Sequence, residues 1–250
     1  MYDSPSHVLV TGGAGFIGSA FVGMLLRDPG GPRVTVLDKL TYAGNPANLK
    51  PFEGDPRFRF LRGDIAETDD VKAALDGVDV VVNFAAETHV DRSLLDAFEF
   101  IRTDVEGTVV LLEASRQAGV SRFVQISTDE VYGPIAPGES ADEAWPLRPR
   151  SPYAASKAGG DLQCLAFHAS YDFPVIITRG SNTYGPRQYP EKVVPLFTIN
   201  AILGRALPLY GDGRQVRDWM HVEDHCAGIW LALTRGEPGT VYNIGPGDER

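Results

Sequence analysis

The sequence has few cysteines and no long apolar run. Cys164 and Cys226 are the only cysteines among 250 residues, too few for the disulfide framework of a small secreted protein. The first ten residues, MYDSPSHVLV, have neither the basic segment nor the apolar stretch of a signal peptide. No run approaches the roughly 18 apolar residues of a membrane helix. We therefore expect a soluble, cytoplasmic protein with reduced thiols and no membrane partner.

Positive charge is also scarce. The chain has 23 Lys and Arg against 33 Asp and Glu, a formal net charge of −10. Nucleic acid binds a basic surface, so this balance argues against nucleic acid as a partner. Hydrophobic residues at 43% and charged residues at 22% are ordinary for a globular protein. The length suits one large α/β domain, or one domain with a smaller lobe.

Short apolar strands alternate with amphipathic stretches along the first 180 residues. The strands are predicted from β-branched runs at residues 7–11, 33–38, 58–62, 78–84, 122–127 and 174–179. Nearly continuous apolar strands separated by helices are typical of a parallel sheet covered on both faces. Right-handed crossovers then give an α/β, doubly wound (Rossmann) sheet.

The composition changes after Arg179. Residues 180–197 are rich in turn formers, and residues 206–226 predict a loop, a short strand and the start of a helix. We expect a dinucleotide-binding domain over 1–179 that carries the catalytic residues, and a smaller C-terminal substrate-binding lobe over 180–250. The chain ends just after another strand pattern, VYNIG, so we expect this lobe to be incomplete.

A glycine pattern joins the first strand to a helix. Gly12, Gly15 and Gly18 stand in VLVTGGAGFIGSAF, where glycine lets the backbone approach a pyrophosphate at the helix N-terminus. Asp38 ends the second strand, twenty residues past Gly18, and can accept a hydrogen bond from a ribose 2′-hydroxyl while repelling a 2′-phosphate. The pattern predicts dinucleotide binding and favours NAD over NADP, although Lys39 beside the acid weakens that preference.

Two further segments follow strands at the expected cofactor edge. Asp64 and Ile65, after the third strand, are placed for an adenine edge; the alternative is the N-terminal cap of a helix. Ala85 and Ala86, after the fourth strand, are small enough to let a cofactor lie close.

Tyr153 and Lys157 are four residues apart and share one face of a helix. An ammonium about 5 Å from a phenol, at an effective dielectric near 20, contributes about 3 kcal/mol, equal to about two pKa units. We therefore expect Lys157 to lower the pKa of Tyr153 towards that of a useful base.

Adjacent acids follow the fifth strand. Asp129 and Glu130 come directly after Ser127 and Thr128, at the carboxyl end of a strand, where the sites of α/β proteins lie. Two carboxyl groups can serve as an acid and a base if their surroundings separate their pKa values. The alternative is a helix-capping or solvated acidic pair.

The segments TGGAGFIG, YAASK and STDEVYG resemble the extended short-chain dehydrogenase/reductase family, the NAD-dependent epimerases and dehydratases. DKLTYAGN, AAETHVDRS, YGPRQYPEKVVPLF and VRDWMHVEDHC are similar to one branch, the dTDP-glucose 4,6-dehydratases. The likeness covers essentially the whole chain. It implies NAD as the cofactor, a nucleotide-diphosphate sugar as the substrate and a homodimer formed through helices around 91–118 and 153–172.

The implied reaction converts the sugar, with dTDP-glucose favoured over UDP-glucose, into its 4-keto-6-deoxy derivative. By resemblance, Tyr153 takes the 4-hydroxyl proton during oxidation at C4, and Thr128 holds the 4-oxygen. The ketone acidifies the hydrogen at C5; Glu130 then removes that proton and Asp129 protonates the departing 6-hydroxyl. Hydride return to C6 completes the reaction.

The resemblance also implies two sets of contacts. The cofactor set comprises Gly12, Gly15, Phe16, Ile17, Gly18, Asp38, Lys39, Leu40, Thr41, Gly44, Asp64, Ile65, Phe84, Ala85, Ala86, Thr88, Thr103, Ser127, Tyr153, Lys157 and Thr183. The substrate set comprises Thr88, Thr128, Asp129, Glu130, Asn182, Lys192, Val193, Pro208, Tyr210, Arg217 and Asn243. Two cations and an amide, Lys192, Arg217 and Asn182, suit a diphosphate.

Two other hypotheses stay open. A nucleotide-sugar epimerase or decarboxylase of the same family needs the tyrosine, the lysine and Thr128 but not the acid pair. A non-catalytic dinucleotide-binding sensor would not need an intact Thr128, Tyr153 and Lys157. No metal is expected: the HVEDH segment lacks the glutamate of a zincin directly after His221, and helix entry with Asp224 as the cap is favoured instead.

Overall fold

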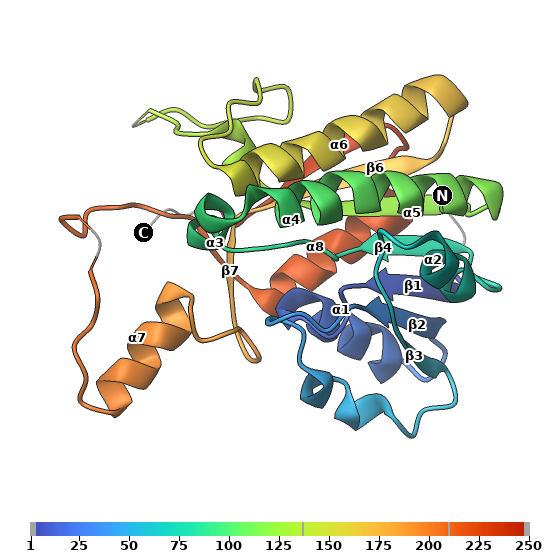
Figure 1. The fold of residues 1–250 in the computed structure, drawn as a ribbon, viewed down its shortest axis with the longest axis horizontal. Helices are drawn as coiled ribbons and strands as arrows, with labels where there is room; N and C mark the ends of the chain where they lie inside the picture. The colour runs from blue at the N-terminus through green and yellow to red at the C-terminus, as the bar shows by residue number, and fades with distance from the viewer. Residues whose placement is uncertain (1–3, 137, 210, 248–250) are drawn as a thin grey trace.

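The structure, a computed structural model, describes residues 4–136, 138–209 and 211–247. Its centre is a sheet of seven parallel strands in the order β3-β2-β1-β4-β5-β6-β9 (Figure 1). The strands are β1 (His7–Thr11), β2 (Arg33–Asp38), β3 (Phe58–Arg62), β4 (Val80–Asn83), β5 (Arg122–Thr128), β6 (Val175–Gly180) and β9 (Thr240–Ile244). The six strands predicted for the first 180 residues and the doubly wound order are confirmed.

Helices cover both faces of the sheet because the strands are apolar on both sides. One layer contains α1 (Phe16–Arg27) and α8 (Val222–Arg235), and the other contains α2 (Thr68–Ala74), α5 (Thr108–Gln117) and α6 (Pro152–Tyr171). Along β1, Val8 and Val10 face the first layer and Leu9 faces the second, as the period of two in a strand requires.

The helices of the second layer are built for close packing. α6 starts at Pro152, and the Ser151 hydroxyl before it accepts a hydrogen bond from the Ala154 N–H. Beside it run α3 (Val90–Leu95), α4 (Ala97–Ile101), a π-helical turn (Arg102–Gly107) and α5 (Figure 1). A Cβ at Gly160 would lie 2.7 Å from the Asp104 carbonyl oxygen, so glycine permits this approach.

The C-terminal segment does not form a lobe along its whole length. α8 packs on α1, and β9 pairs in parallel with β6, so both extend the main sheet and its cover. Beyond the carboxyl ends of the strands lie a small parallel pair, β7 (Asn182–Tyr184) with β8 (Trp219–His221), and the helix α7 (Val193–Ile202) (Figure 1). No residue of α7 is buried. No described helix is long and apolar enough to cross a membrane.

One local expectation is wrong. α8 begins at Val222, and its N-cap is His221, whose ring accepts a hydrogen bond from the Glu223 N–H. Asp224 lies in the first turn of the helix and is not the cap. The strand β8 runs directly into the helix, which moves the helix start three residues towards the N-terminus, from a cap at Asp224 to a cap at His221.

A buried ion pair connects four elements behind the carboxyl edge. The Arg179 Nε on β6 donates to the Asp161 carboxylate on α6 at 3.0 Å, and the two side chains are 3% and 0% exposed. Arg179 also donates to the Tyr132 hydroxyl at 3.0 Å, and that hydroxyl donates to the Asn243 side-chain oxygen on β9 at 2.6 Å. A buried guanidinium needs such partners because desolvation of an unpaired charge is costly.

We expect Asp161→Ala to lower the free energy of unfolding by about 3–5 kcal/mol, because it leaves the Arg179 guanidinium buried without its counter-charge. Urea unfolding at pH 7 measures the change. Glu223→Ala is the control: it breaks an ion pair with Arg27 whose side chains are 60% and 70% exposed. Its cost should stay below about 1 kcal/mol. Equal losses in the two variants would contradict the role of burial.

Candidate active site

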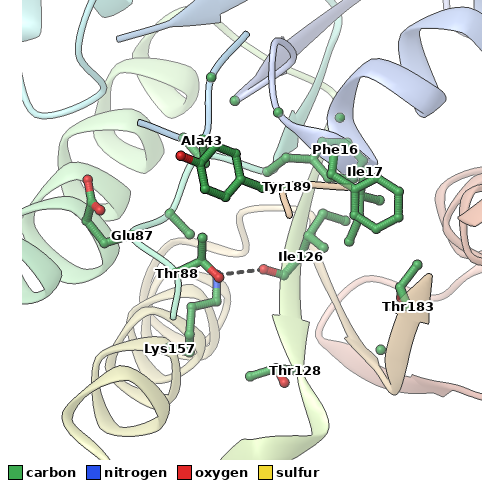
Figure 2. Close-up of a pocket in the computed structure, with 18 of the residues that line it drawn as sticks. Phe16, Ile17, Ala43, Glu87, Thr88, Ile126, Thr128, Lys157, Thr183 and Tyr189 are labelled. Atoms are coloured by element: carbon green, nitrogen blue, oxygen red, sulfur yellow. Dashed lines mark hydrogen bonds between the residues drawn. The ribbon is translucent and has the colours of Figure 1, made fainter. Parts of the chain in front are cut away.

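A cavity runs along the carboxyl edge of the sheet, from the ends of β2 and β3 to the ends of β5 and β6 (Figure 2). It crosses the point between β1 and β4 where the strand order reverses, the usual ligand position in such sheets. The predicted site residues that line it are Gly12, Gly15, Phe16, Ile17, Gly18, Asp38, Lys39, Thr41, Gly44, Asp64, Ile65, Phe84, Ala85, Ala86, Thr88, Thr103, Ser127, Thr128, Glu130, Tyr153, Lys157, Asn182, Thr183, Lys192, Val193 and Arg217.

Four of the predicted residues do not line the cavity. Leu40 donates its N–H to the Asp38 carboxylate at 2.8 Å, and the Asp129 carboxylate accepts from the Thr128 hydroxyl at 3.2 Å. Pro208 is exposed. The Asn243 amide accepts from Tyr132 and donates to the Ala141 carbonyl at 3.1 Å, so in this structure it joins the sheet edge to a loop. Tyr210 lies outside the described residues.

The glycine turn brings the backbone close to neighbouring chain segments. Gly12 has φ +65°, and a Cβ there would lie 2.7 Å from the Ala85 backbone nitrogen. A Cβ at Gly18 would meet the Gly12 carbonyl oxygen. The N-cap of α1 is Gly15, which has no side chain to occupy the free N–H groups of the first turn. These groups open onto the cavity and fit a pyrophosphate.

Asp38 is held rigidly at the end of β2. Its carboxylate accepts hydrogen bonds from Ala14 N–H at 2.9 Å and Leu40 N–H at 2.8 Å. Burial raises the pKa of Asp38, and the two N–H groups oppose that shift. Each carboxylate oxygen keeps a lone pair for a ribose hydroxyl. The Lys39 ammonium pairs with Asp64 at 2.9 Å, so it does not neutralise Asp38. The residues present therefore fit NAD.

The catalytic cluster comes from two neighbouring elements. α6 presents Tyr153 and Lys157 on one face, and the buried Lys157 ammonium donates to the Ile126 carbonyl at 2.8 Å (Figure 2). β5 ends at Thr128 and leads into a 3-10 turn, η4 (Asp129–Tyr132). The Thr128 hydroxyl accepts from the Glu130 N–H and donates to the Asp129 carboxylate, each at 3.2 Å. Thr128 thus fixes both acids.

The environment raises the pKa values of both acids. Burial is the larger cause for Asp129, opposed by its bond from Thr128 and by the charge of Arg217. Glu130 as a whole residue is exposed, but its carboxyl group faces the cavity, where loss of hydration and then the Asp129 charge raise its pKa. A raised pKa makes each carboxyl group a better proton carrier near neutral pH.

The pKa of Tyr153 shifts in the direction opposite to the one expected from the sequence. The sequence predicts a pKa lowered by Lys157, but burial, followed by the Glu130 charge, raises the pKa of Tyr153 in the structure. The Lys157 ammonium is engaged by the Ile126 carbonyl. The sequence predicted the helical spacing of Tyr153 and Lys157. The burial of the Tyr153 phenol and the nearby Glu130 charge depend on the tertiary structure.

Further residues line the cavity without having been predicted. They are Leu37, Ala43, Gly63, Glu87, Ile126, Gly180, Ser181, Gln188, Tyr189, Glu191, Trp219 and His225. Most adjoin predicted residues: Glu87 precedes Thr88, and Glu191 precedes Lys192. His225 had no such signal. It reaches the cavity from α8, and its buried ring shares a hydrogen bond with the Thr183 hydroxyl at 2.8 Å.

Comparison with known proteins assigns the chain to a family. Residues 8–245 match the model of the NAD dependent epimerase/dehydratase family, and the chain therefore belongs to this family. A dTDP-glucose 4,6-dehydratase of Streptomyces griseus is 56% identical over 245 residues, which cover 97% of this chain and 74% of the relative. The resemblance drawn from the sequence motifs is confirmed.

Solved structures agree with this assignment. The structure of DesIV, a dTDP-glucose 4,6-dehydratase from Streptomyces venezuelae with NAD and TYD bound, matches with a TM-score of 0.94 at 55% identity, over 98% of this chain and 77% of that chain. UDP-glucuronic acid 4-epimerase from Bacillus cereus, in complex with UDP-glucuronic acid and NAD, matches with a TM-score of 0.92 at 31% identity, over 98% and 79%. The fold alone therefore does not separate dehydratases from epimerases.

We expect His225 to make stability depend on pH. Burial lowers its pKa from 6.5 to about 4, so the unfolded chain binds the proton more tightly. The contribution is fully present above pH 6.5 and is lost as the pH falls towards 4, by about 2 kcal/mol between pH 7 and pH 5. Urea unfolding of the wild type and His225→Gln at both pH values isolates it. The same pH dependence in both proteins would refute it.

Proposed function

We propose that this chain is an NAD-dependent dTDP-glucose 4,6-dehydratase, a lyase that removes water from the sugar of a nucleotide-diphosphate hexose. The acid pair Asp129–Glu130, held by Thr128 beside Tyr153 at the carboxyl edge of the sheet, carries the proposal. Oxidation at C4 needs only a tyrosine, a lysine and a hydroxyl, whereas elimination of water also needs a base and an acid. The dehydratase names of the similar proteins support the same activity.

The first task of the site is to move a proton from the 4-hydroxyl. NAD held by the glycine turn and Asp38 would supply the hydride chemistry, taking up hydride from C4 and giving it back at C6. Tyr153 is the base for the 4-hydroxyl, and the Thr128 hydroxyl, which donates to Asp129 in this structure, would turn its proton to the 4-oxygen when the sugar binds. Lys157, fixed by the Ile126 carbonyl, places a positive charge beside them. A positive charge there stabilises negative charge that develops on the 4-oxygen during proton removal.

The second task is elimination across C5–C6. A ketone at C4 acidifies the C5 hydrogen, so a carboxylate suffices as the base, and Glu130 faces the cavity for this role. Asp129, the first residue of η4, is proposed to supply the proton for the departing 6-hydroxyl. The raised pKa of Asp129 favours the protonated form that an acid needs.

The substrate diphosphate is proposed to bind between Asn182, Lys192 and Arg217, which line the cavity from the segment after β6. Two cations can neutralise a diphosphate, and the Asn182 amide can donate to it. In this division residues 1–179 hold the cofactor and residues 180–250 supply the substrate contacts. α8 and β9 are the exception, because they cover and extend the cofactor-binding sheet.

Incubation of the purified protein with dTDP-glucose in D₂O tests the proposal, with UDP-glucose in parallel. We expect a product that has lost one water and carries deuterium at C5, and a higher rate with dTDP-glucose. Unchanged mass with both sugars would overturn the dehydratase assignment. A product of unchanged mass with inverted C4 would instead identify an epimerase.

Glu130→Gln should slow the loss of water by about 10²–10⁴-fold, because the amide cannot remove the C5 proton. Deuterium incorporation at C5 should fall in parallel. Glu53→Gln is the control, since Glu53 is exposed at the end of a 3-10 turn outside the cavity. A Glu130→Gln protein as active as Glu53→Gln would remove Glu130 from the mechanism.

We also propose a cytoplasmic homodimer. The two cysteines are free and buried, as suits a reducing compartment. An apolar surface on α3, α4 and α6 supports the dimer: its members are Leu94, Leu95, Phe98, Ile101 and Leu162, each at least half exposed. Leu95 is 88% and Phe98 86% exposed. A contiguous apolar surface of this kind marks a protein contact.

Phe98→Asp should halve the mass measured by light scattering, because a carboxylate at the proposed interface would be buried without a partner. Leu231→Asp is the matched control: Leu231 is 59% exposed on α8, in the opposite helical layer. Its mass should equal that of the wild type. A wild-type protein that is monomeric at micromolar concentration would contradict the dimer.

A further inference from the structure

Three segments that resemble the dehydratase branch meet at one point of the cavity wall. Tyr42 comes from DKLTYAGN after β2, Arg92 from AAETHVDRS in α3, and Glu191 from YGPRQYPEKVVPLF before α7. Thr41 and Ala43 line the cavity on one side and Glu191 with Tyr189 on another. None of the proposed catalytic steps uses Tyr42, Arg92 or Glu191, so their meeting needs another explanation.

The three side chains are tied to one another. The Tyr42 hydroxyl shares its one proton between two acceptors, the Thr88 carbonyl oxygen at 2.9 Å and a Glu191 carboxylate oxygen at 3.2 Å. The Arg92 guanidinium lies 3.5 Å from the centre of the Tyr42 ring, and its Nε is 3.6 Å from the other Glu191 oxygen. The Glu191 side chain is 17% exposed, so its carboxylate has lost most of its hydration, and these partners replace the lost contacts with water.

This cluster connects two cavity-lining chain segments that are far apart in sequence. Tyr42 and Glu191 are 149 residues apart in sequence, and the bond between them joins the loop after β2 to the segment 185–192. In the same segment, Tyr189 packs edge-on against the Tyr42 ring at 5.5 Å, and Arg187 donates to the Ser19 carbonyl on α1 at 3.2 Å. Tyr189, Ala43 and Ile17 all line the cavity (Figure 2).

We propose that Tyr42, Arg92 and Glu191 form a clasp that retains NAD in the cavity. The clasp holds segment 185–192 against the loop after β2, and a cofactor bound along the glycine turn can leave only when these contacts open. This inference rests on the proposed function in one respect: a reaction that begins and ends with the same bound NAD is interrupted if the cofactor escapes midway.

The contacts favour a closed clasp for electrostatic reasons. Burial, followed by the Glu191 charge, raises the pKa of Tyr42, so the hydroxyl remains protonated and acts as a donor. A hydrogen bond to a carboxylate is stronger than one between neutral groups. The Arg92 guanidinium stacks on the Tyr42 ring and also pairs with the Glu191 carboxylate. Arg92 therefore contacts both Tyr42 and Glu191 and stabilises their contact with each other.

The test measures release of NAD from the loaded protein, with no sugar present. Holoprotein is mixed with an excess of a competing dinucleotide, and free NAD is quantified over time after rapid filtration. Tyr42→Phe removes the hydroxyl and keeps the ring, and Glu191→Gln removes the charge and keeps the shape. We expect each to raise the release rate about tenfold, the size of one lost charge-assisted hydrogen bond.

Matched controls exist on the surface. The Tyr171 ring also lies under an arginine, Arg116, at 4.8 Å, and Glu113 pairs with that arginine at 2.7 Å, all away from the cavity. Tyr171→Phe and Glu113→Gln should release NAD at the wild-type rate. The double variant Tyr42→Phe/Glu191→Gln should release NAD more slowly than the product of the two single effects, because both changes act on the shared Tyr42–Glu191 hydrogen bond.

Release within twofold of wild type in both Tyr42→Phe and Glu191→Gln would overturn the clasp. So would a wild-type protein that does not retain NAD through filtration, or multiplied effects in the double variant. If either variant fails to fold, Arg92→Lys serves in its place, since it keeps the charge and loses the planar stacking. Retention of NAD without conversion of dTDP-glucose would leave the clasp standing and refute only the proposed function.

Discussion

Burial of the sheet on both faces is the constraint on which the rest of the structure depends. With α1 and α8 on one side and α2, α5 and α6 on the other, a ligand can reach the sheet only at the ends of its strands. The turns that follow β1, β4 and β5 open at the same edge because the strands are parallel. The glycine turn and Glu130 of the acid pair therefore share one cavity, although more than a hundred residues separate them.

Two kinds of group line the cavity: backbone and small residues near the glycine turn, and ionisable side chains near the end of β5. Groups that approach the cofactor are backbone N–H groups and small residues, as at Gly12 and Ala85, where a larger side chain would collide. Groups that approach the sugar are ionisable, and their pKa values are shifted by burial and by one another. The ion pair of Arg179 and Asp161 lies just behind these groups and ties the end of η4 to α6, which keeps the acid pair and Tyr153 in fixed relative positions.

Much of the fold and the cofactor side of the site followed from local sequence patterns. The strands at 7–11 and 33–38, the glycines between them and the acid at Asp38 occur in one continuous βαβ unit, so their spacing alone places them. One expectation, the Asp224 cap, failed, and one contact of Asn243 was not foreseen, because neighbouring elements decide both. Asn243 bonds to Tyr132 because β9 joins the sheet beside β6, and α8 begins at Val222 because β8 leads directly into it. No pattern within either segment encodes the neighbouring strand.

The sequence by itself determined the type and order of the elements, the glycine turn, the tyrosine–lysine spacing and the position of the two acids. These depend on periodicity and turn chemistry over a few residues. Only the tertiary structure decided the upward shift in the Tyr153 pKa, the place of β9, and the meeting of Tyr42, Arg92 and Glu191. Each of these depends on burial or on contacts between residues far apart in the chain, which are settled only when the layers have packed.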